Sequence, residues 1–579
     1  MRLARSKVRA SAHVAHGLRA TAPTRRARTV EDARLETIST ALVLLLAVVI
    51  SGFISHVRPL PIPRPLVQIA LGCLIAAVTE LRMVLDPEVF FLLFVPPLLF
   101  LDGWRIPKEQ VVEDGAVILN LSLGLVLFTM LGIGMLLHWL IPAMPLAVAF
   151  ALAAVVSPTD PIALSAIAAR VPIPPRMKHI LDGEALLNDA SSLVFFRFAT
   201  IAAVTGSFSL PSAVMSLVWA ALGGVAVGIA ITWGTTRAKE WLIRRVGEDS
   251  GSQIIISLLI PFAAYLVAER LHCSGILAAV AAGVTMSIVE ASGSALPSTR
   301  LRRNTVWDTV QFAANGMIFV LLGAQLPDLV SRADETVLAT GHTDPAWLLV
   351  YVGAIYVGMV SLRFAWVWIS LRLTVAAAKL RGTSSFPPNL RLVSATAVAG
   401  VRGAITLAAV MTLPLALGDG TPFPSRDLAI ALAMGVIITS LVVASVCLPP
   451  MLPGLRLPGA RNTDAEEDRA RVFAANAAIR RIERLERELP HDHTDREVHA
   501  AAAALMTRLY RLRIEARSRE GEAADHARGN EAVETQLRIA AIEAERSAVI
   551  KLLKARKIDG ETARKLVREL DLLQARYEL

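Results

Sequence analysis

The chain has 579 residues, of which 54% are hydrophobic and only 19% are charged, and its formal net charge is +10 at pH 7. A water-soluble protein of this size would carry far more polar residues, so the composition excludes that class. Much of the positive charge lies at the N-terminus and between apolar blocks, which is a membrane-topology signal and not a nucleic-acid groove. Cys73, Cys273 and Cys447 are isolated from one another, so we expect them to be small packing residues.

Apolar blocks follow one another along the chain, each of the length that crosses a bilayer as a helix. We therefore predict an all-α, polytopic membrane protein with about 13 transmembrane helices. Residues 1–36 are a basic arm expected to be disordered, residues 37–455 the transmembrane domain, and residues 456–579 a helical tail. The predicted spans have approximate cores at 38–57, 65–80, 88–102, 115–141, 145–169, 179–206, 211–235, 252–269, 274–290, 305–326, 346–371, 392–417 and 427–453.

Lys and Arg are distributed unequally between the loops on the two sides of the predicted membrane. Loops after odd-numbered spans hold 18 of these residues, and loops after even-numbered spans hold 4. Because cytoplasmic loops carry the excess of positive charge, the odd loops and the tail are predicted to be cytoplasmic. An odd number of spans then places the N-terminus outside, although residues 1–30 hold eight Arg or Lys and no acid. Either the arm is absent from the mature protein, or the count is wrong by one span near the start.

The sixth predicted span carries polar residues that a lipid-facing helix would not tolerate, namely Asp182, Glu184, Asn188 and Asp189. A carboxylate near the bilayer centre costs several kcal/mol unless it faces protein or water. Glu184 and Asn188 share a helix face, and Asp189 lies one residue further round. We hypothesise that Asp189 binds a monovalent cation or a proton, but never both together.

The fifth predicted span is interrupted by the sequence Ser157-Pro-Thr-Asp-Pro161. Pro158 and Pro161 lack a backbone donor, and proline kinks or unwinds a helix. The freed carbonyl groups, together with Ser157, Thr159 and Asp160, are oxygen ligands of the kind that a hard cation requires. The alternative is a structural proline kink with a satisfied Asp160. The combination of Pro, Asp and Thr at mid-span favours the ion site.

The twelfth predicted span places Arg402 between Gly400 and Gly403. An arginine at mid-span needs an acidic partner, and Glu184 and Asp160 are the candidates. Two compatible functions remain open, a structural ion pair between helices and control of the charge of the site. Spans one to six and spans eight to thirteen form two sets of six, and the interrupted span is the fifth member of each set. Such a pattern predicts two inverted six-helix repeats with crossed broken helices and a site at the midplane.

Other polar residues within the spans have more ordinary explanations. Asp102 lies near a predicted membrane interface, where a role in an ion pathway is the less favoured alternative. Arg197 and Arg363 are interpreted as packing or lipid-interface residues. Asn315 and Gln325 are interpreted as residues that form hydrogen bonds between helices.

The three motifs together resemble the bacterial sodium/proton exchangers of the monovalent cation:proton antiporter group, in the branch with an Asn-Asp motif. The similarity covers most of residues 40–455 and rests on Ser157-Pro-Thr-Asp-Pro161, Gly183-Glu-Ala-Leu-Leu-Asn-Asp189 and Gly400-Val-Arg-Gly403. The resemblance implies an inverted-repeat fold of about 13 helices with partly unwound fifth and twelfth helices. It also implies a homodimer and electroneutral, one-for-one exchange.

The resemblance further implies the roles of particular residues. The Na⁺ ligands that it implies are Asp189, Asp160, Glu184 and the backbone carbonyl of Thr159. Asn188 and Arg402 would stabilise the core of the site. Members of the family often carry Ser after the Glu of this motif, whereas this chain carries Ala185. Ser157, Ser191 or water would then have to supply the missing oxygen.

We therefore predict a secondary active transporter, and not an enzyme, that exchanges Na⁺ or Li⁺ for H⁺ across the bacterial inner membrane in pH homeostasis. The sequence does not separate this function from K⁺/H⁺ exchange. A cation channel is disfavoured because no TVGYG-type filter occurs, and an intramembrane enzyme because no HExxH, GxSxG or GxxxxGK[ST] motif occurs. A membrane sensor without transport is the remaining alternative. We expect no cofactor and no nucleic acid, and the partners are the lipid bilayer and a second copy of the chain.

Overall fold

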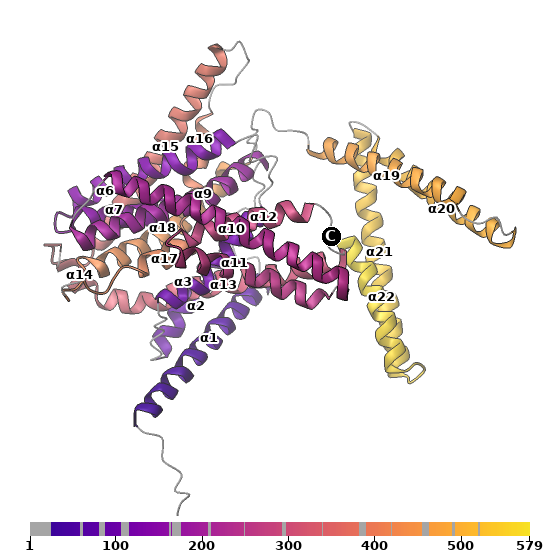
Figure 1. Ribbon diagram of the computed structural model, residues 1–579, viewed down its shortest axis with the longest axis horizontal. Helices are drawn as coiled ribbons and strands as arrows, with labels where there is room; N and C mark the ends of the chain where they lie inside the picture. Colours follow the sequence, from indigo (N-terminus) through magenta and orange to yellow (C-terminus); the bar gives the residue numbers. More distant parts are fainter. Residues whose placement is uncertain are drawn as a thin grey trace, which may run out of the picture. The chain divides into compact units, whose positions relative to one another are not determined.

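The protein is all-helical in the part of the chain that the structure describes. The computed structural model (Figure 1) describes residues 25–57, 62–79, 87–105, 115–160, 164, 175–206, 210–247, 249–291, 297–338, 340–380, 389–417, 420–453, 463–488, 493–518 and 522–578. Apart from one isolated β-bridge between Ala416 and Pro422, these residues form helices and connecting segments. The all-α prediction is confirmed there. The chain divides into two compact units, Met1–Pro458 and Gly459–Leu579.

The first unit contains the apolar helices. Within the described residues, seven helices are both long and apolar enough to cross a bilayer, and four further apolar helices are shorter. The count of 13 spans stays a prediction. The elements of this unit are α1 (Arg25–Val57), α2 (Arg64–Val78), α3 (Pro87–Arg105), α5 (Gly115–Leu119), the π-helical turn η1 (Asn120–Leu125), α6 (Val126–Leu140), α7 (Leu146–Val156), α9 (Pro175–Thr205), α10 (Leu210–Val246), α11 (Ser250–Arg270), α12 (Gly275–Ala291), α13 (Pro297–Ser331), α14 (Ala333–Leu338), α15 (Trp347–Leu380), α16 (Leu390–Val398), α17 (Ala404–Met411) and α18 (Arg426–Met451).

Several helix starts follow from local sequence. Asp249 caps α11 by accepting hydrogen bonds from the backbone N–H groups of Gly251 and Ser252, and Asn389 caps α16 in the same way. The start of α1 differs from the prediction. The arm 1–36 is expected to be disordered, but α1 begins at Arg25, so the segment from 25 to 36 is helical. Residues 1–24 lie outside the described residues.

The first unit consists of two groups of helices, each packed mainly within itself. The first helix group contains α1, α2, α3, α10, α11, α12 and α13, and the second helix group contains α5, η1, α6, α7, α9, α15, α16, α17 and α18. The groups touch mainly where α3 and α13 meet α17, with smaller contacts of α9 and α18. Packing that is dense within the groups and sparse between them suits rigid-body movement of one group against the other.

The crossing of α2 with α13 is closed by a glycine on each helix. A Cβ atom on Gly72 would overlap the carbonyl oxygen of Val320, and a Cβ atom on Gly323 would overlap that of Ile69. Neither position accepts even an alanine without a shift of the opposite backbone. Small residues of this kind let membrane helices approach closely, where lipid provides no hydrophobic drive for association.

The crossing of α3 with α12 repeats the same arrangement. Cβ atoms on Gly103 and Gly283 would meet the carbonyl groups of Val280 and Phe100. In the predicted repeats the second span corresponds to the ninth and the third to the tenth. The α2–α13 and α3–α12 crossings are therefore equivalent positions, which supports the inverted repeat.

The second unit is helical, as the periodicity of the tail sequence predicts, and its helices form two hairpins. The pairs are α19 (Thr463–Glu488) with α20 (His493–Arg517), and α21 (Glu522–Lys554) with α22 (Gly560–Glu578). An ion pair of 2.8 Å between Arg517 and Asp468 joins the first hairpin. One of 2.9 Å between Arg546 and Asp571 joins the second.

Candidate ion-binding site

Two interrupted helices of the second helix group meet at their breaks. α7 ends at Val156, and the next residues up to Asp160 are not helical; the chain is likewise irregular between α16 and α17. The backbone N–H of Asp160 donates to the carbonyl oxygen of Val401 at 2.7 Å. The crossed broken helices are thus confirmed. Each break satisfies a backbone group that the other leaves free, as the interior of a membrane requires.

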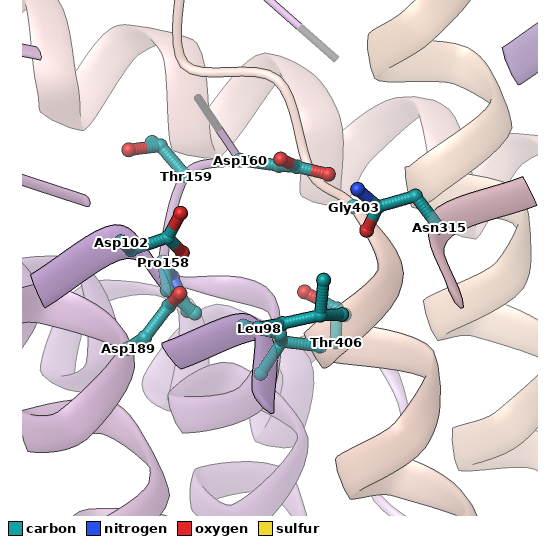
Figure 2. Close-up of a pocket in the computed structure, with 10 residues that line it drawn as sticks. Leu98, Asp102, Pro158, Thr159, Asp160, Asp189, Asn315, Gly403 and Thr406 are labelled. Atoms are coloured by element: carbon teal, nitrogen blue, oxygen red, sulfur yellow. The ribbon is translucent and has the colours of Figure 1, made fainter. Parts of the chain in front are cut away.

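A cavity lies beside this crossing, at the boundary between the two helix groups. The empty volume of the cavity, including the part that is open to solvent, is about 370 Å³. The first helix group contributes Leu98, Asp102 and Asn315. The second contributes Pro158, Thr159, Asp160, Asp189, Gly403, Ile405 and Thr406. Figure 2 shows the carboxylates of Asp102 and Asp189 on one side of the cavity, with Asp160 and Asn315 across from them.

Three carboxylates therefore share one small space, in which Asp102 and Asp160 are half-buried and Asp189 is buried. Asp189 is only 5% exposed. Like charges repel strongly where water is scarce, so a cation or protons must neutralise part of this charge. Among the described residues, no group of three or more His, Cys, Asp or Glu side chains is close enough to hold a metal ion by itself. Other oxygen atoms, such as those of Asn315, Thr406 or water, must complete the shell of a bound cation.

Glu184 does not line the cavity, because an arginine holds it. Arg363 on α15 donates from Nη1 to Glu184 Oε1 at 2.5 Å and from Nη2 to Oε2 at 2.7 Å. Both side chains are at most 2% exposed. Of the two roles expected for Arg363, packing inside the protein holds and pairing at the lipid interface does not, because its partner is the buried Glu184. A bidentate pair of this kind satisfies two charges that neither helix could otherwise bury.

Arg402 lies buried at the crossing and bonds to backbone carbonyl groups. Its Nε donates to the oxygen of Val156 at 2.9 Å, and its Nη1 bonds to the oxygen of Gly400. Of the two acidic partners predicted for Arg402, Glu184 forms its ion pair with Arg363 instead. Since Val156 is the last residue of α7, the guanidinium meets the negative end of that helix dipole. Arg402 thus stabilises the break itself.

Thr159 and Asn188 connect the break in α7 to the buried ion pair. Asn188 Nδ2 donates to Thr159 Oγ1 at 3.1 Å, and the Thr159 hydroxyl donates to Glu184 Oε1 at 3.5 Å. The hydroxyl of Thr159 is therefore directed at α9, although the residue also lines the cavity. These bonds fix the position of the break relative to α9.

The two serines considered as substitutes for a missing hydroxyl are engaged elsewhere. Ser157 donates to the carbonyl oxygen of Val126 at 3.5 Å, and Ser191 donates to that of Ser122 at 2.9 Å. Neither belongs to the cavity lining. Because Ala185 has no hydroxyl, that oxygen has to come from water or from another polar residue of the cavity, such as Asn315 or Thr406.

Some residues of the site were assigned less well from sequence or were not singled out. Asn315 was interpreted as a residue that forms hydrogen bonds between helices, and the structure shows that it lines the cavity. Asp102 lies in the same cavity, which supports the less favoured ion-pathway interpretation. Thr406 was not singled out from sequence. It lies three residues after Gly403, and this spacing from the break in the twelfth span could have indicated that it is near the site. Pro158 lines the cavity, whereas Pro161 lies outside the described residues.

Gly403 is in direct contact with Asp160, and we predict that this contact is essential. A Cβ atom at position 403 would overlap the Asp160 carboxylate. Gly403→Ala should therefore displace Asp160 and lower the exchange rate by at least about tenfold, as small misplacements at reactive sites do. The rate is measured in proteoliposomes. Gly353→Ala on α15 is the control, because a Cβ atom there meets nothing within 4 Å. Equal rates for the two variants would contradict the prediction.

Comparisons with known proteins agree with this geometry. The model of the family "sodium/hydrogen exchanger, transmembrane" matches residues 43–454. A protein of Escherichia coli described as an uncharacterised Na⁺/H⁺ exchanger is 39% identical over 550 residues, which cover 93% of this chain and 99% of the relative. A sodium, potassium, lithium and rubidium/H⁺ antiporter of Bacillus pumilus is 37% identical over 546 residues, which cover 94% and 78% of the two chains.

The fold is also shared with a solved structure. The sodium proton antiporter MjNhaP1 of Methanocaldococcus jannaschii aligns with a TM-score of 0.54 and 18% identity, covering 72% of this chain and 99% of that one. The family match includes both broken helices and every residue that lines the cavity. The chain therefore belongs to the sodium/hydrogen exchanger family, whose members are membrane antiporters.

Proposed function

We propose that this protein exchanges Na⁺ or Li⁺ for H⁺ across the bacterial inner membrane, with Asp189 binding the cation and the proton in turn. The observation that carries the proposal is the cavity between the helix groups, where Asp102, Asp160 and Asp189 meet beside the crossed breaks. Carboxylate and carbonyl oxygens are ligands for hard cations, and a carboxylate can take a proton in place of the cation. A group that accepts either one, but not both, couples the two fluxes.

The proposed mechanism is alternating access by movement of one helix group against the other. Asp160 and the Thr159 carbonyl complete the cation shell around Asp189. A bare carboxylate is penalised in a low-dielectric interior, so the helix groups move only when a cation or a proton neutralises the site. One cation exchanged for one proton transfers no net charge, and the exchange is electroneutral. Glu184, Asn188 and Arg402 act by holding the breaks in place.

A second candidate is exchange of K⁺ as well as Na⁺. The relative from Bacillus pumilus is named for sodium, potassium, lithium and rubidium, and its similarity extends over 94% of this chain. This favours a site of broad selectivity. The oxygen atoms of the cavity do not distinguish between the two candidates.

Reconstitution tests the proposal and separates the candidates. Purified protein is placed in vesicles that contain a pH dye, and Na⁺, Li⁺ and K⁺ are added in turn, with and without a membrane potential. We expect saturable, cation-dependent proton movement whose rate is unchanged by the potential. A response to Na⁺ and Li⁺ alone supports the first candidate, and an equal response to K⁺ supports the second. Proton movement that ignores the cation would overturn both.

The proposed sidedness places the odd loops and the tail in the cytoplasm. Two arginines near the end of α10 stack on tryptophans one turn away, Arg237 on Trp233 at 5.3 Å and Arg245 on Trp241 at 4.2 Å. Aromatic rings of this kind gather at the membrane–water interface, and the excess of Arg and Lys marks its cytoplasmic side. Both features support a cytoplasmic end of α10.

We also propose a homodimer that serves pH homeostasis. Only 17% of the most apolar stretch of α10 is buried within the chain, whereas 50% of the corresponding stretch is buried in α13 and in α18. A second copy or lipid must cover this surface. Chemical cross-linking in native membranes tests the assembly.

A further inference from the structure

An ion pair bridges the two helix groups at one end of the site. Arg197 belongs to α9 of the second helix group and Glu269 to α11 of the first, with Arg197 Nη2 2.9 Å from Glu269 Oε1. Arg197 lies about 12 Å beyond Asp189 along the helix, at the α-helical rise of 1.5 Å per residue. The side chains are 45% and 33% exposed, so separating them leaves no fully buried charge.

Glu269 keeps a partner of its own when Arg197 moves away. Its Oε1 also accepts a hydrogen bond of 3.2 Å from the backbone N–H of Gly275, the first residue of α12. The positive end of the α12 dipole favours a carboxylate there. Tyr265 is packed close to the same glycine. Glu269 is therefore a fixed acceptor on the first helix group, and the ion pair can open and close reversibly.

A second contact joins the helix groups at the same end. α11 and α13 run in parallel, because hydrogen bonds join their early turns in order, namely Arg302 to Ser250 and Trp307 to Ser257. Glu269 and Gln325, near the far ends of these helices, therefore lie at one end of the unit. Gln325 Nε2 donates to the sulfur of Met411 on α17 at 3.3 Å. The two contacts therefore join the helix groups at the end of the unit where α9, α11 and α13 finish. Lys178 and Arg302, near the starts of α9 and α13, lie at the opposite end.

We propose that Arg197 and Glu269 form a latch that holds the second helix group in the state seen here and sets the balance between the two transport states. This inference rests on the proposed function. With the odd loops in the cytoplasm, the latch closes the outer end, and this state exposes the cavity to the cytoplasm. A partly exposed ion pair of this kind shifts a two-state equilibrium by about two- to fivefold.

The latch predicts opposite changes at the two faces of the membrane. In Arg197→Gln and Glu269→Gln, fewer molecules face the cytoplasm, so the Na⁺ concentration for half-maximal transport should rise at the cytoplasmic face, by at most about two- to fivefold. At the outer face it should fall. Arg197→Lys keeps the charge and should stay close to the wild type. Arg197 also forms a hydrogen bond with Tyr265 of α11, which Arg197→Gln loses and Glu269→Gln keeps. The double variant should therefore shift no further than Arg197→Gln, because it loses the same interactions between the helix groups.

The measurement uses the full chain in vesicles of both orientations, after size-exclusion chromatography has shown that each variant is folded. Asp308→Asn is the matched control, since it removes a similarly exposed pair with Arg105 that lies within the first helix group. It should leave both half-maximal concentrations unchanged. Unchanged values at both faces in Arg197→Gln, or a lower maximal rate alone, would overturn the latch and leave the exchange function standing. Absence of cation-driven proton movement in the wild type would overturn the exchange function itself.

Discussion

Asp189→Asn is expected to abolish cation-driven proton movement while the protein remains folded. The amide has nearly the shape of the carboxylate, but it neither takes up a proton nor balances the charge of a cation. Asp189 is 5% exposed and lies in the cavity beside the crossed breaks, so no bulk water can replace its charge. In proteoliposomes with an internal pH dye, the response to a pulse of Na⁺ should fall to that of protein-free vesicles.

Asp182→Asn is the matched control for this experiment. Asp182 lies two turns earlier on α9, is half-buried and does not belong to the cavity lining. The control should keep most of the transport, because it removes a carboxylate from the same helix that does not line the cavity. A normal Na⁺ response in Asp189→Asn would show that another carboxylate carries the coupling.

Arg363→Gln is expected to destabilise the protein more than any surface substitution. The change leaves the Glu184 carboxylate buried with no counter-charge, and such a loss costs about 3–5 kcal/mol in proteins. Exchange should fall with stability, because Glu184 also accepts a hydrogen bond from Thr159 at the break. Thermal unfolding in detergent measures the loss of stability.

The double variant Arg363→Gln/Glu184→Gln separates charge from shape. Two amides can still form a hydrogen bond, and neither one leaves an uncompensated charge. The double variant should therefore recover most of the stability that the single variant loses. A single variant as stable as the wild type would mean that Glu184 is protonated or paired in another way.

The position of the site could be predicted from sequence because its chemistry is local. Pro158 removes a backbone donor, Gly403 provides close approach, and Asp160 and Asp189 are carboxylates in otherwise apolar segments. Each of these signals depends on a few adjacent residues. The breaks and the acidic residues near them were therefore placed in the right helices, and the structure brings the two breaks together.

The choice of partners could not be predicted, because it depends on how each helix is rotated about its axis. Glu184 and Arg363 are 179 residues apart, and nothing in the spacing favours Arg363 over Arg402. A search for acidic partners of Arg402 also overlooks uncharged acceptors. The broken helices leave backbone carbonyl groups free, and Arg402 donates to one of them. Asn315 faces the cavity for the same rotational reason.

The start of α1 shows a different limit. Hydropathy detects the part of a helix that lies in lipid, and it is blind to a polar extension. Residues 25–36 are rich in Arg, Ala and Glu, which are good helix formers, so α1 continues through them.

The glycine crossings of the first helix group have a consequence for the response to bilayer thickness. With backbone against backbone at Gly72, Gly323, Gly103 and Gly283, α2, α3, α12 and α13 cannot tilt independently of their crossing partners. Hydrophobic mismatch is relieved by tilting or by deformation of the lipid. In vesicles of longer or shorter acyl chains, these helices should therefore tilt together, and the mismatch should change the angle between them and the helices of the second helix group.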